Sequence, residues 1–238
     1  MSSPPTGARL DLQVWCVELD VDAAALDTAL RRLSADERTW ADRLRQPAHR
    51  RQFVVTRAAL RSVLGSALGA SPETVEIEAD DRGKPRLVAG GLHFNLSHAG
   101  GLALIAVCAD HPVGVDVEQV GRDVSELDDI ARTYFSASEQ SAYFALTPVD
   151  RVDAFYRVWT RKEAVAKALG LGMSLAGPSF DVSLSITAPR LLRLGDDATP
   201  APWSLIDLDL AGPYVGAAAI QATGLSLGLR RFEGLAPA

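Results

Sequence analysis

Hydrophobic and polar residues alternate with a period of two in some stretches of the chain and follow a helical period in others. The first alternating stretch, LDLQVWCVELD at residues 10–20, predicts a strand. Helical periodicity follows in three stretches, residues 22–33, 34–44 and 49–65. The second of these opens with the capping-box pair Ser34 and Glu37, and the third is predicted to end at Gly65. Four strand-like stretches then complete the first half: TVEIEA, PRLV, LHFNLS and GLALIAVCA.

The same order of strand, helices and strands occurs a second time. VGVDVEQV at residues 113–120 alternates again, and helices are predicted to begin near Asp123, Ser136 and Asp150. Five strand-like stretches close the chain: SFDVSLSI, RLLRL, WSLIDLDL, YVGAAAI and LSLGLRRF. We therefore predict an α/β (α+β) fold of two similar halves, residues 1–112 and 113–238, packed as an intramolecular pseudo-dimer. Each half is expected to have a small, mainly antiparallel sheet covered by helices.

The composition narrows the class of protein. A hydrophobic content of 47% favours a folded chain over a disordered one. Apolar runs are too short to cross a bilayer, and MSSPPTGARL lacks the apolar segment of an export signal, so we expect a cytoplasmic protein without membrane contact. Cys16 and Cys108 have no metal-site spacing and are expected to be reduced core residues.

The charge is negative overall but unevenly distributed. A formal net charge of -6 argues against nucleic-acid binding through phosphate contacts. Arginines nevertheless outnumber acidic residues between Arg31 and Arg61. A solvated helix face and a binding site for a small polyanion both explain this local excess.

Two acidic residues lie on one face of the strand VGVDVE. The strand period of two places Gly114, Asp116 and Glu118 on one face and the valines on the other. Neighbouring carboxylates repel each other unless solvent or a cation separates them, and a hard divalent cation prefers carboxylate and phosphate oxygens. On this strand alone, a solvated edge strand is the simpler explanation.

The helix expected at residues 150–169 adds a third carboxylate. Glu163 falls near the middle of its apolar arc and Lys167 at the edge, whereas Arg161 faces the other way. A buried carboxylate without a partner costs on the order of several kcal/mol. An i,i+4 salt bridge to Lys167 is one explanation, although such pairs normally lie on exposed faces. The apolar position favours a metal shared by Glu163, Asp116 and Glu118, with Lys167 facing negative charge on a substrate.

Two segments of the first half present polar groups. Gly83-Lys84-Pro85 predicts a turn that exposes Lys84, and NLSHAGG ends a strand with Ser97 and His98 before two glycines. Such a loop suits phosphate oxygens, although His98 taken alone is more often structural. The sequence contains no motif typical of nucleoside triphosphate, dinucleotide, serine-hydrolase or zinc-protease sites.

The ordered set GKP, FNLSH, GVDVE and WTRKEAVAK resembles the larger, pseudo-dimeric, Sfp-type 4'-phosphopantetheinyl transferases. Their signatures are a G-[IV]-D-[IV]-E strand, a later W-x-x-K-E-x-x-x-K helix and an upstream N-x-S-H loop. The resemblance implies transfer of the 4'-phosphopantetheine arm of coenzyme A to a serine of an apo carrier protein, leaving adenosine 3',5'-bisphosphate. It also implies Mg²⁺, or Mn²⁺, as the metal, and carriers of fatty-acid, polyketide or nonribosomal peptide synthesis. The organisation in two similar halves predicts a monomer.

The resemblance further implies roles for individual residues. Asp116, Glu118 and Glu163 would bind the metal, and Glu163 and Lys167 would be catalytic. Coenzyme A would contact Arg51, Arg57, Lys84, Ser97, His98, Lys162 and Lys167. The first half would hold the nucleotide, and the second half would hold the metal. From the residues alone, two alternatives stay open: another metal-dependent, phosphodiester-cleaving enzyme, and a non-catalytic module that binds coenzyme A or a nucleotide.

Overall fold

The structure is a computed structural model that describes residues 10–81, 83–171, 177–197 and 200–235. The elements of the first half are β1 (Leu10–Glu18), α1 (Ala23–Arg32), α2 (Ala35–Arg43), α3 (Pro47–Leu68), η1 (Pro72–Thr74), β2 (Ile77–Ala79), β3 (Pro85–Leu87), β4 (His93–Ala99) and β5 (Leu102–Cys108). Those that follow are β6 (Val113–Gln119), α4 (Val124–Tyr134), α5 (Ala137–Phe144), α6 (Pro148–Leu169), η2 (Gly177–Ser179), β7 (Phe180–Val182), β8 (Leu191–Leu194), β9 (Ser204–Leu208), β10 (Tyr214–Ile220) and β11 (Leu225–Arg231).

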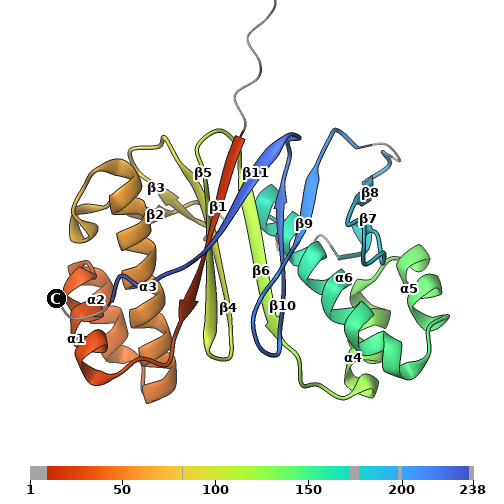
Figure 1. Cartoon of the computed structure of the whole chain (residues 1–238), viewed down its shortest axis with the longest axis horizontal. Coiled ribbons are helices and arrows are strands. Elements are labelled where there is room, and N and C mark those ends of the chain that lie inside the picture. Colours follow the sequence, from red (N-terminus) through yellow and green to blue (C-terminus); the bar gives the residue numbers. More distant parts are fainter. Residues whose placement is uncertain (1–9, 82, 172–176, 198–199, 236–238) are drawn as a thin grey trace, which may run out of the picture.

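Two sheets stand side by side in the middle of the molecule, with helices outside them (Figure 1). One has the strand order β11-β1-β5-β4 and the other the order β6-β10-β9. All their pairings are antiparallel except that of β1 with β11. Helices α1 to α3 flank the first sheet and α4 to α6 the second. The predicted α/β fold of two halves with small, mainly antiparallel sheets is confirmed.

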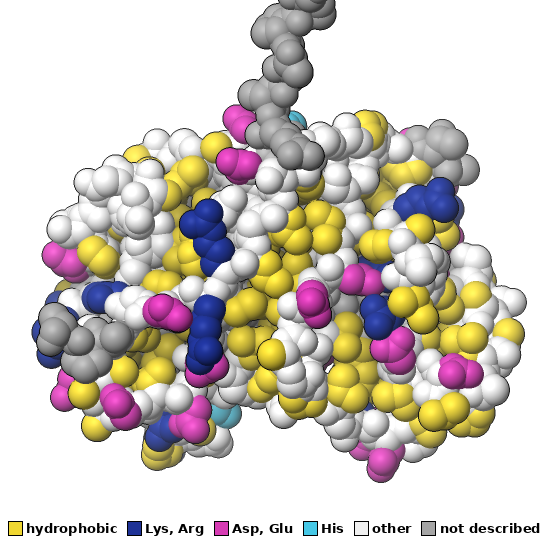
Figure 2. Space-filling model, in the orientation of Figure 1, with side chains coloured by type: hydrophobic (Ala, Val, Ile, Leu, Met, Phe, Trp, Pro, Cys, Tyr) yellow, Lys and Arg dark blue, Asp and Glu magenta, His cyan; other side chains and the backbone are white. Residues whose placement is uncertain are grey.

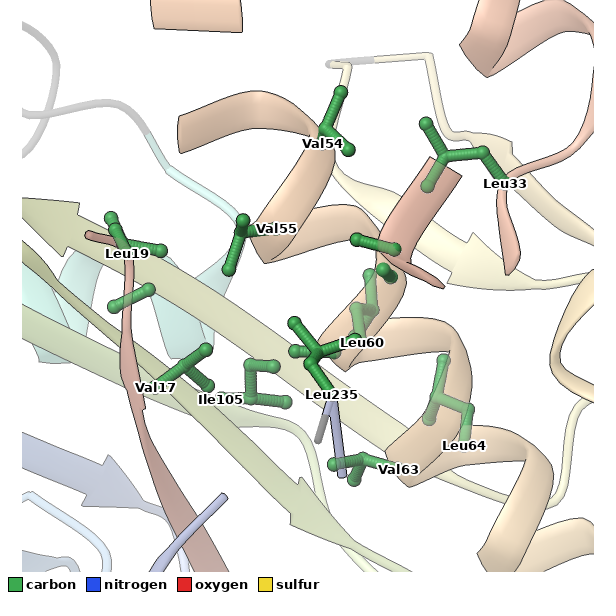
Figure 3. Packing of buried hydrophobic residues seen from close by; sticks show 14 of the residues in the cluster. Val17, Leu19, Leu33, Val54, Val55, Leu60, Val63, Leu64, Ile105 and Leu235 are labelled. Carbon is green, nitrogen blue, oxygen red and sulfur yellow. The ribbon is translucent and has the colours of Figure 1, made fainter. Parts of the chain in front are cut away.

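Each half packs its helices on its own sheet, and a third cluster joins the sheets. In the first half, Val55 and Leu60 of α3 face the strand residues Val17 and Ile105 (Figure 3). The seam between the sheets contains the three valines of VGVDVE, namely Val113, Val115 and Val117. The predicted alternation of β6 is therefore correct. Hydrophobic side chains also gather on the surface near the centre of the face shown in Figure 2.

The helix boundaries follow the local signals with one exception. Ser34 with Glu37, and Ser136 with Glu139, form the two expected capping boxes. The end predicted at Gly65 is wrong, because α3 continues to Leu68 and stops at Gly69, which has a φ of 66°. A Cβ atom at Gly65 would lie 2.6 Å from the Ala70 carbonyl oxygen. This glycine therefore permits a close contact between the helix and the backbone that follows its end, and it does not terminate the helix.

Both cysteines are free, with Cys16 half-buried and Cys108 buried, as expected. None of the helices within the described ranges is long and apolar enough to cross a bilayer.

Candidate active site

Strand β6 and helix α6 approach each other closely because position 114 has no side chain. A Cβ atom at Gly114 would lie 1.9 Å from the Ala164 carbonyl oxygen and 2.5 Å from the Ala168 amide nitrogen. No larger residue fits there without moving the strand from the helix. The contact places the acidic face of β6 directly beside the face of α6 that carries Glu163 and Lys167.

Asp116 is the centre of a hydrogen-bonded cluster formed by both halves. Its Oδ1 accepts from the Lys167 ammonium at 2.6 Å and from the Ser97 hydroxyl at 2.7 Å. Lys167 also donates to the Ser97 Oγ at 3.0 Å. The side chain of Asp116 is 5% exposed and that of Lys167 26%. Burial raises the pKa of Asp116, and the nearby ammonium and hydroxyl oppose that rise.

The other two carboxylates lie near Asp116 without joining its hydrogen bonds. Glu118 accepts from the indole Nε1 of Trp159 at 3.1 Å. No described residue forms a hydrogen bond or ion pair with Glu163. Burial, then the charge of Asp116, raise the pKa of Glu163 to about 7, against the opposing effect of Lys167. Burial and Asp116 also raise the pKa of Glu118. The three acids therefore influence one another electrostatically.

The chemistry of this cluster suits a divalent cation, although the side chains are not arranged as a ready set of ligands. The second carboxylate oxygen of Asp116, Oδ2, is buried, and no described residue bonds to it. An unpaired buried oxygen is costly, and three adjacent carboxylates repel one another, so a cation would relieve both effects. Within the described ranges, however, no three His, Cys, Asp or Glu residues are placed to hold a metal together. In this arrangement the Lys167 ammonium is the cation that Asp116 contacts.

Lys84 and His98, two residues of the first half, both lie near Lys167. The Lys84 ammonium donates to the Lys167 carbonyl oxygen at 2.6 Å, at the last turn of α6. A cation there complements the carbonyl end of the helix and ties the first half to the second. His98 is exposed, and burial of its ring, followed by the charge of Lys167, lowers its pKa.

A pocket of about 520 Å³ opens beside His98, between α2, α3 and β4. Of the two arginines predicted to contact coenzyme A, Arg57 lines the pocket. Arg51 does not border it and instead forms an exposed ion pair with Asp20 at 2.5 Å. The residues on the pocket wall that the sequence analysis missed are Trp40, Leu44, His49, Gln52, Phe53 and Thr56. Four of them, His49, Gln52, Phe53 and Thr56, lie on α3 at positions i, i+3, i+4 and i+7 of one helix face, which is the signal that could have found them.

Comparison with known proteins adds independent information to this geometry. The family described as 4'-phosphopantetheinyl transferase superfamily matches residues 112–219. The family described as 4'-phosphopantetheinyl transferase, N-terminal, matches residues 21–110. The chain is 35% identical over 230 residues to the 4'-phosphopantetheinyl transferase HetI of Nostoc sp., covering 94% of each protein. It is 30% identical over 203 residues to a 4'-phosphopantetheinyl transferase of Bacillus subtilis, covering 83% of this chain and 88% of that protein.

The chain belongs to the 4'-phosphopantetheinyl transferase superfamily. It is also 29% identical over 151 residues to Sfp of Bacillus subtilis strain 168, covering 63% of this chain and 66% of Sfp. The Sfp-type resemblance of the four motifs is therefore confirmed. Members of this superfamily transfer the 4'-phosphopantetheine arm of coenzyme A to a serine hydroxyl of a carrier protein, and the chain is an enzyme with this activity.

Two expectations for α6 of this transferase need correction. Lys162 was expected to contact coenzyme A, but its side chain is fully buried and donates to Glu139 at 2.8 Å and 3.1 Å and to the Phe180 carbonyl at 2.6 Å. Its ammonium is therefore not available to a ligand in this structure. Arg161, expected to face away from the core, is also buried and binds Asp207.

Lys162 and Arg161 are buried because other elements cover α6 on several sides. The sheet β6-β10-β9, helices α4 and α5, and strand β7 all contact it. A helical projection with one apolar arc assumes one covered side, so it placed the half-buried stripe of Trp159, Glu163 and Lys167 in the core. That stripe is instead the side of α6 that opens toward the cluster around Asp116.

Proposed function

We propose that Asp116, Glu118 and Glu163 hold a Mg²⁺ ion and that coenzyme A binds with its pyrophosphate beside Lys167 and His98. The proposal rests on one observation, the convergence of Ser97, Asp116 and Lys167 next to His98, the β4 residue that borders the pocket. A bound divalent cation would neutralise charge on the pyrophosphate oxygens and on the leaving phosphate. Mn²⁺ takes similar oxygen ligands and is expected to substitute for it.

The remaining steps use groups of the chain itself. The serine hydroxyl of the carrier attacks the β-phosphorus, and the bond from that phosphorus to the bridging oxygen of adenosine 3',5'-bisphosphate breaks. Glu163 accepts the serine proton as the general base, since a carboxylate beside the reacting hydroxyl can serve in this role. Lys167 exchanges its contact with Asp116 for the phosphoryl oxygens, where it stabilises the charge of the transition state. Ser97 holds the carboxylate of Asp116 in position meanwhile.

The test is a transfer assay with the full chain, fluorescently tagged coenzyme A, Mg²⁺ and a purified apo carrier protein. We expect covalent label on the carrier with the wild type. Glu163→Gln should fold normally but lose at least about a hundredfold in turnover, by the usual contribution of a general base. Near-normal turnover of this variant would refute the role of Glu163. Label that forms at the same rate in excess chelator would refute the metal proposal.

We further propose that the chain acts as a monomer on carriers of fatty-acid, polyketide or nonribosomal peptide synthases. Support for the monomer comes from Ser97 of the first half and Asp116 and Lys167 of the second, which meet within one chain. Sedimentation of the active protein tests the monomer, and a panel of apo carriers from the three systems tests the target. Nucleic acid has no role in this proposal.

The proposal also covers the division of the chain into halves and its location in the cell. We propose that the halves divide near residue 112, with the nucleotide held mainly by the first and the metal by the second. The pocket wall of α3 and the acids of β6 and α6 support this division. We also propose a cytoplasmic location, since two free cysteines suit a reducing compartment.

A further inference from the structure

Trp40 is unusual among the large hydrophobic residues of the chain. It lies on α2, its side chain is 53% exposed, and it borders the pocket of about 520 Å³. No described residue makes a ring or cation contact with its indole. The exposed half of the indole is not stabilised by packing within the chain, and a large aromatic face at the rim of a pocket points to a ligand.

The wall around Trp40 is suited to a flat aromatic group. Leu44, Phe53, Phe94 and Leu96 also line the pocket. The Phe53 ring already carries the Arg57 guanidinium, which lies 5.8 Å from its centroid. Trp40 is therefore the aromatic side chain of this wall that has a face free for stacking.

The position of the pocket indicates which part of a ligand reaches Trp40. His98 lines the pocket, and Ser97, its neighbour on β4, forms hydrogen bonds with Asp116 and Lys167. The pocket and the cluster of Lys167 and Asp116 therefore lie against adjacent residues of β4, and the pocket extends from His98 toward Trp40 of α2. If the pyrophosphate of coenzyme A lies at that cluster, as the proposed function requires, the nucleoside can extend into the pocket. Adenine is the only aromatic group of coenzyme A.

We propose that the adenine base of coenzyme A stacks on Trp40, which makes Trp40 a specificity-determining residue for the nucleotide part of the substrate. Stacking of a base on an aromatic side chain is tolerant of its edge chemistry and contributes appreciably to affinity. The proposal rests on the proposed function, because it takes the pyrophosphate end of coenzyme A as fixed at Lys167.

The experiment measures binding of three ligands to the full chain: coenzyme A, adenosine 3',5'-bisphosphate and 4'-phosphopantetheine, which lacks the base. Trp40→Ala should weaken binding of the first two about tenfold, within the five- to 150-fold range expected for one stacked base. Binding of 4'-phosphopantetheine should be unchanged. Trp40→Phe keeps an aromatic face and should recover most of the affinity. Leu44→Ala removes apolar area from the same pocket without removing a ring, and should change affinity less than threefold.

Fluorescence and kinetics distinguish a contact between Trp40 and adenine from a purely structural role of Trp40. Adenosine 3',5'-bisphosphate should quench the tryptophan emission of the wild type, and Trp40→Phe should abolish that quenching. In the transfer assay, Trp40→Ala should raise the KM for coenzyme A and leave kcat and the melting temperature unchanged, since the side chain is exposed. Equal affinity of Trp40→Ala and wild type for the bisphosphate overturns the proposal. A KM raised only for the carrier also overturns it and assigns Trp40 to carrier contact. A wild type that binds no coenzyme A overturns the proposed function as well, which the wild-type control reveals directly.

Discussion

Helices α3 and α6 are equivalent elements of the two halves, and only α6 places a carboxylate and an ammonium, those of Glu163 and Lys167, beside the acids of β6. Each runs for 22 residues from a proline and ends at a glycine in the left-handed region, Gly69 with φ 66° and Gly170 with φ 70°. Each follows a short helix with a capping box of serine and glutamate. The two halves of the pseudo-dimer therefore share their local design as well as their order of elements.

A buried ion pair occurs at the same place in both helices. Arg61 of α3 binds Glu37, and Lys162 of α6 binds Glu139. The two cations lie equally far from the prolines that open their helices, and each glutamate is also the residue that closes a capping box. A pair that is repeated in a half without the acidic cluster belongs to the scaffold.

The difference begins at the next residue. Ser62 in α3 occupies the position of Glu163 in α6, and Ser66 occupies that of Lys167. The comparison teaches that Glu163 and Lys167, the residues proposed to be catalytic, lie on a helix whose packing also occurs in the other half without them. It also explains why Lys162, adjacent to Glu163 in sequence, points into the core of its own half.

The largest expected effect concerns the paired cations. Lys162→Met leaves Glu139 buried without a counter-charge and should cost about 3–5 kcal/mol in the free energy of unfolding. Arg61→Met should cost less, because the side chain of Glu37 is 13% exposed and that of Glu139 only 2%. Urea denaturation of both variants measures this. If Lys162→Met keeps its stability but loses affinity for coenzyme A, Lys162 is a ligand contact and the comparison fails.

The second test compares alanine substitutions at equivalent positions of the two helices. Lys167→Ala removes the ammonium that is expected to stabilise phosphoryl charge, and should lower kcat by about 10²- to 10³-fold. Ser66→Ala, at the equivalent exposed position of α3, should leave kcat unchanged. Steady-state transfer kinetics with saturating carrier measure both. Comparable losses in the two variants would show that the activity depends on the shape of both helices and not on the charge of one.

A third, smaller effect tests the close contact that brings the acids to α6. Gly114→Ala would force a Cβ atom to within 1.9 Å of the Ala164 carbonyl, so β6 must shift. We expect a loss of about 1–3 kcal/mol in stability and a reduced kcat. Gly121→Ala is the matched control, because a Cβ atom there meets nothing within 4 Å. Thermal unfolding distinguishes the two, and an unchanged Gly114→Ala protein would contradict the packing argument.

The smallest expected effect is a pH dependence of stability that arises at Glu163 of α6. Burial and the charge of Asp116 raise the pKa of Glu163 from an ordinary 4.5 to about 7. Between these values the folded chain holds a proton that the unfolded chain has lost, so the free energy of unfolding should fall as pH rises through this window. Denaturation in chelator at pH 5 and pH 7.5 measures the slope. Glu163→Gln should reduce it, and added Mg²⁺ should reduce it in the wild type. A slope identical in wild type and Glu163→Gln would remove Glu163 as its source.

The sequence predicted most of the fold because short-range signals coincide with the elements. The alternation of β6 and the two capping boxes each depend on residues that are only a few positions apart. Gly65 misled the prediction because the reason for that glycine is a contact with Ala70 across a turn. The partner of β1 could not be predicted either, since β11 comes from the far end of the chain.

In the candidate site too, local patterns predicted some residues, and contacts remote in sequence determine the others. Asp116 and Glu118 were assigned to one face by the strand period, and Glu163 by its conflict with an apolar pattern. The burial of Lys162 depends on Glu139 and Phe180, which are remote in sequence, so a helical projection could not show it. Trp40 was missed because it looks like an ordinary amphipathic position until the pocket beside it is known.

Strand β11 has a consequence for how the chain is made. It lies beyond both family-matched segments and pairs with β1 over a register that runs from Leu225 opposite Leu10 to Arg231 opposite Cys16. During synthesis the first half emerges early, but the outer edge of β1 stays unpaired until β11 has left the ribosome. An open strand edge invites association with other chains. A nascent or truncated chain that ends before residue 225 should therefore aggregate, and the two halves should not be separable into independently folding pieces.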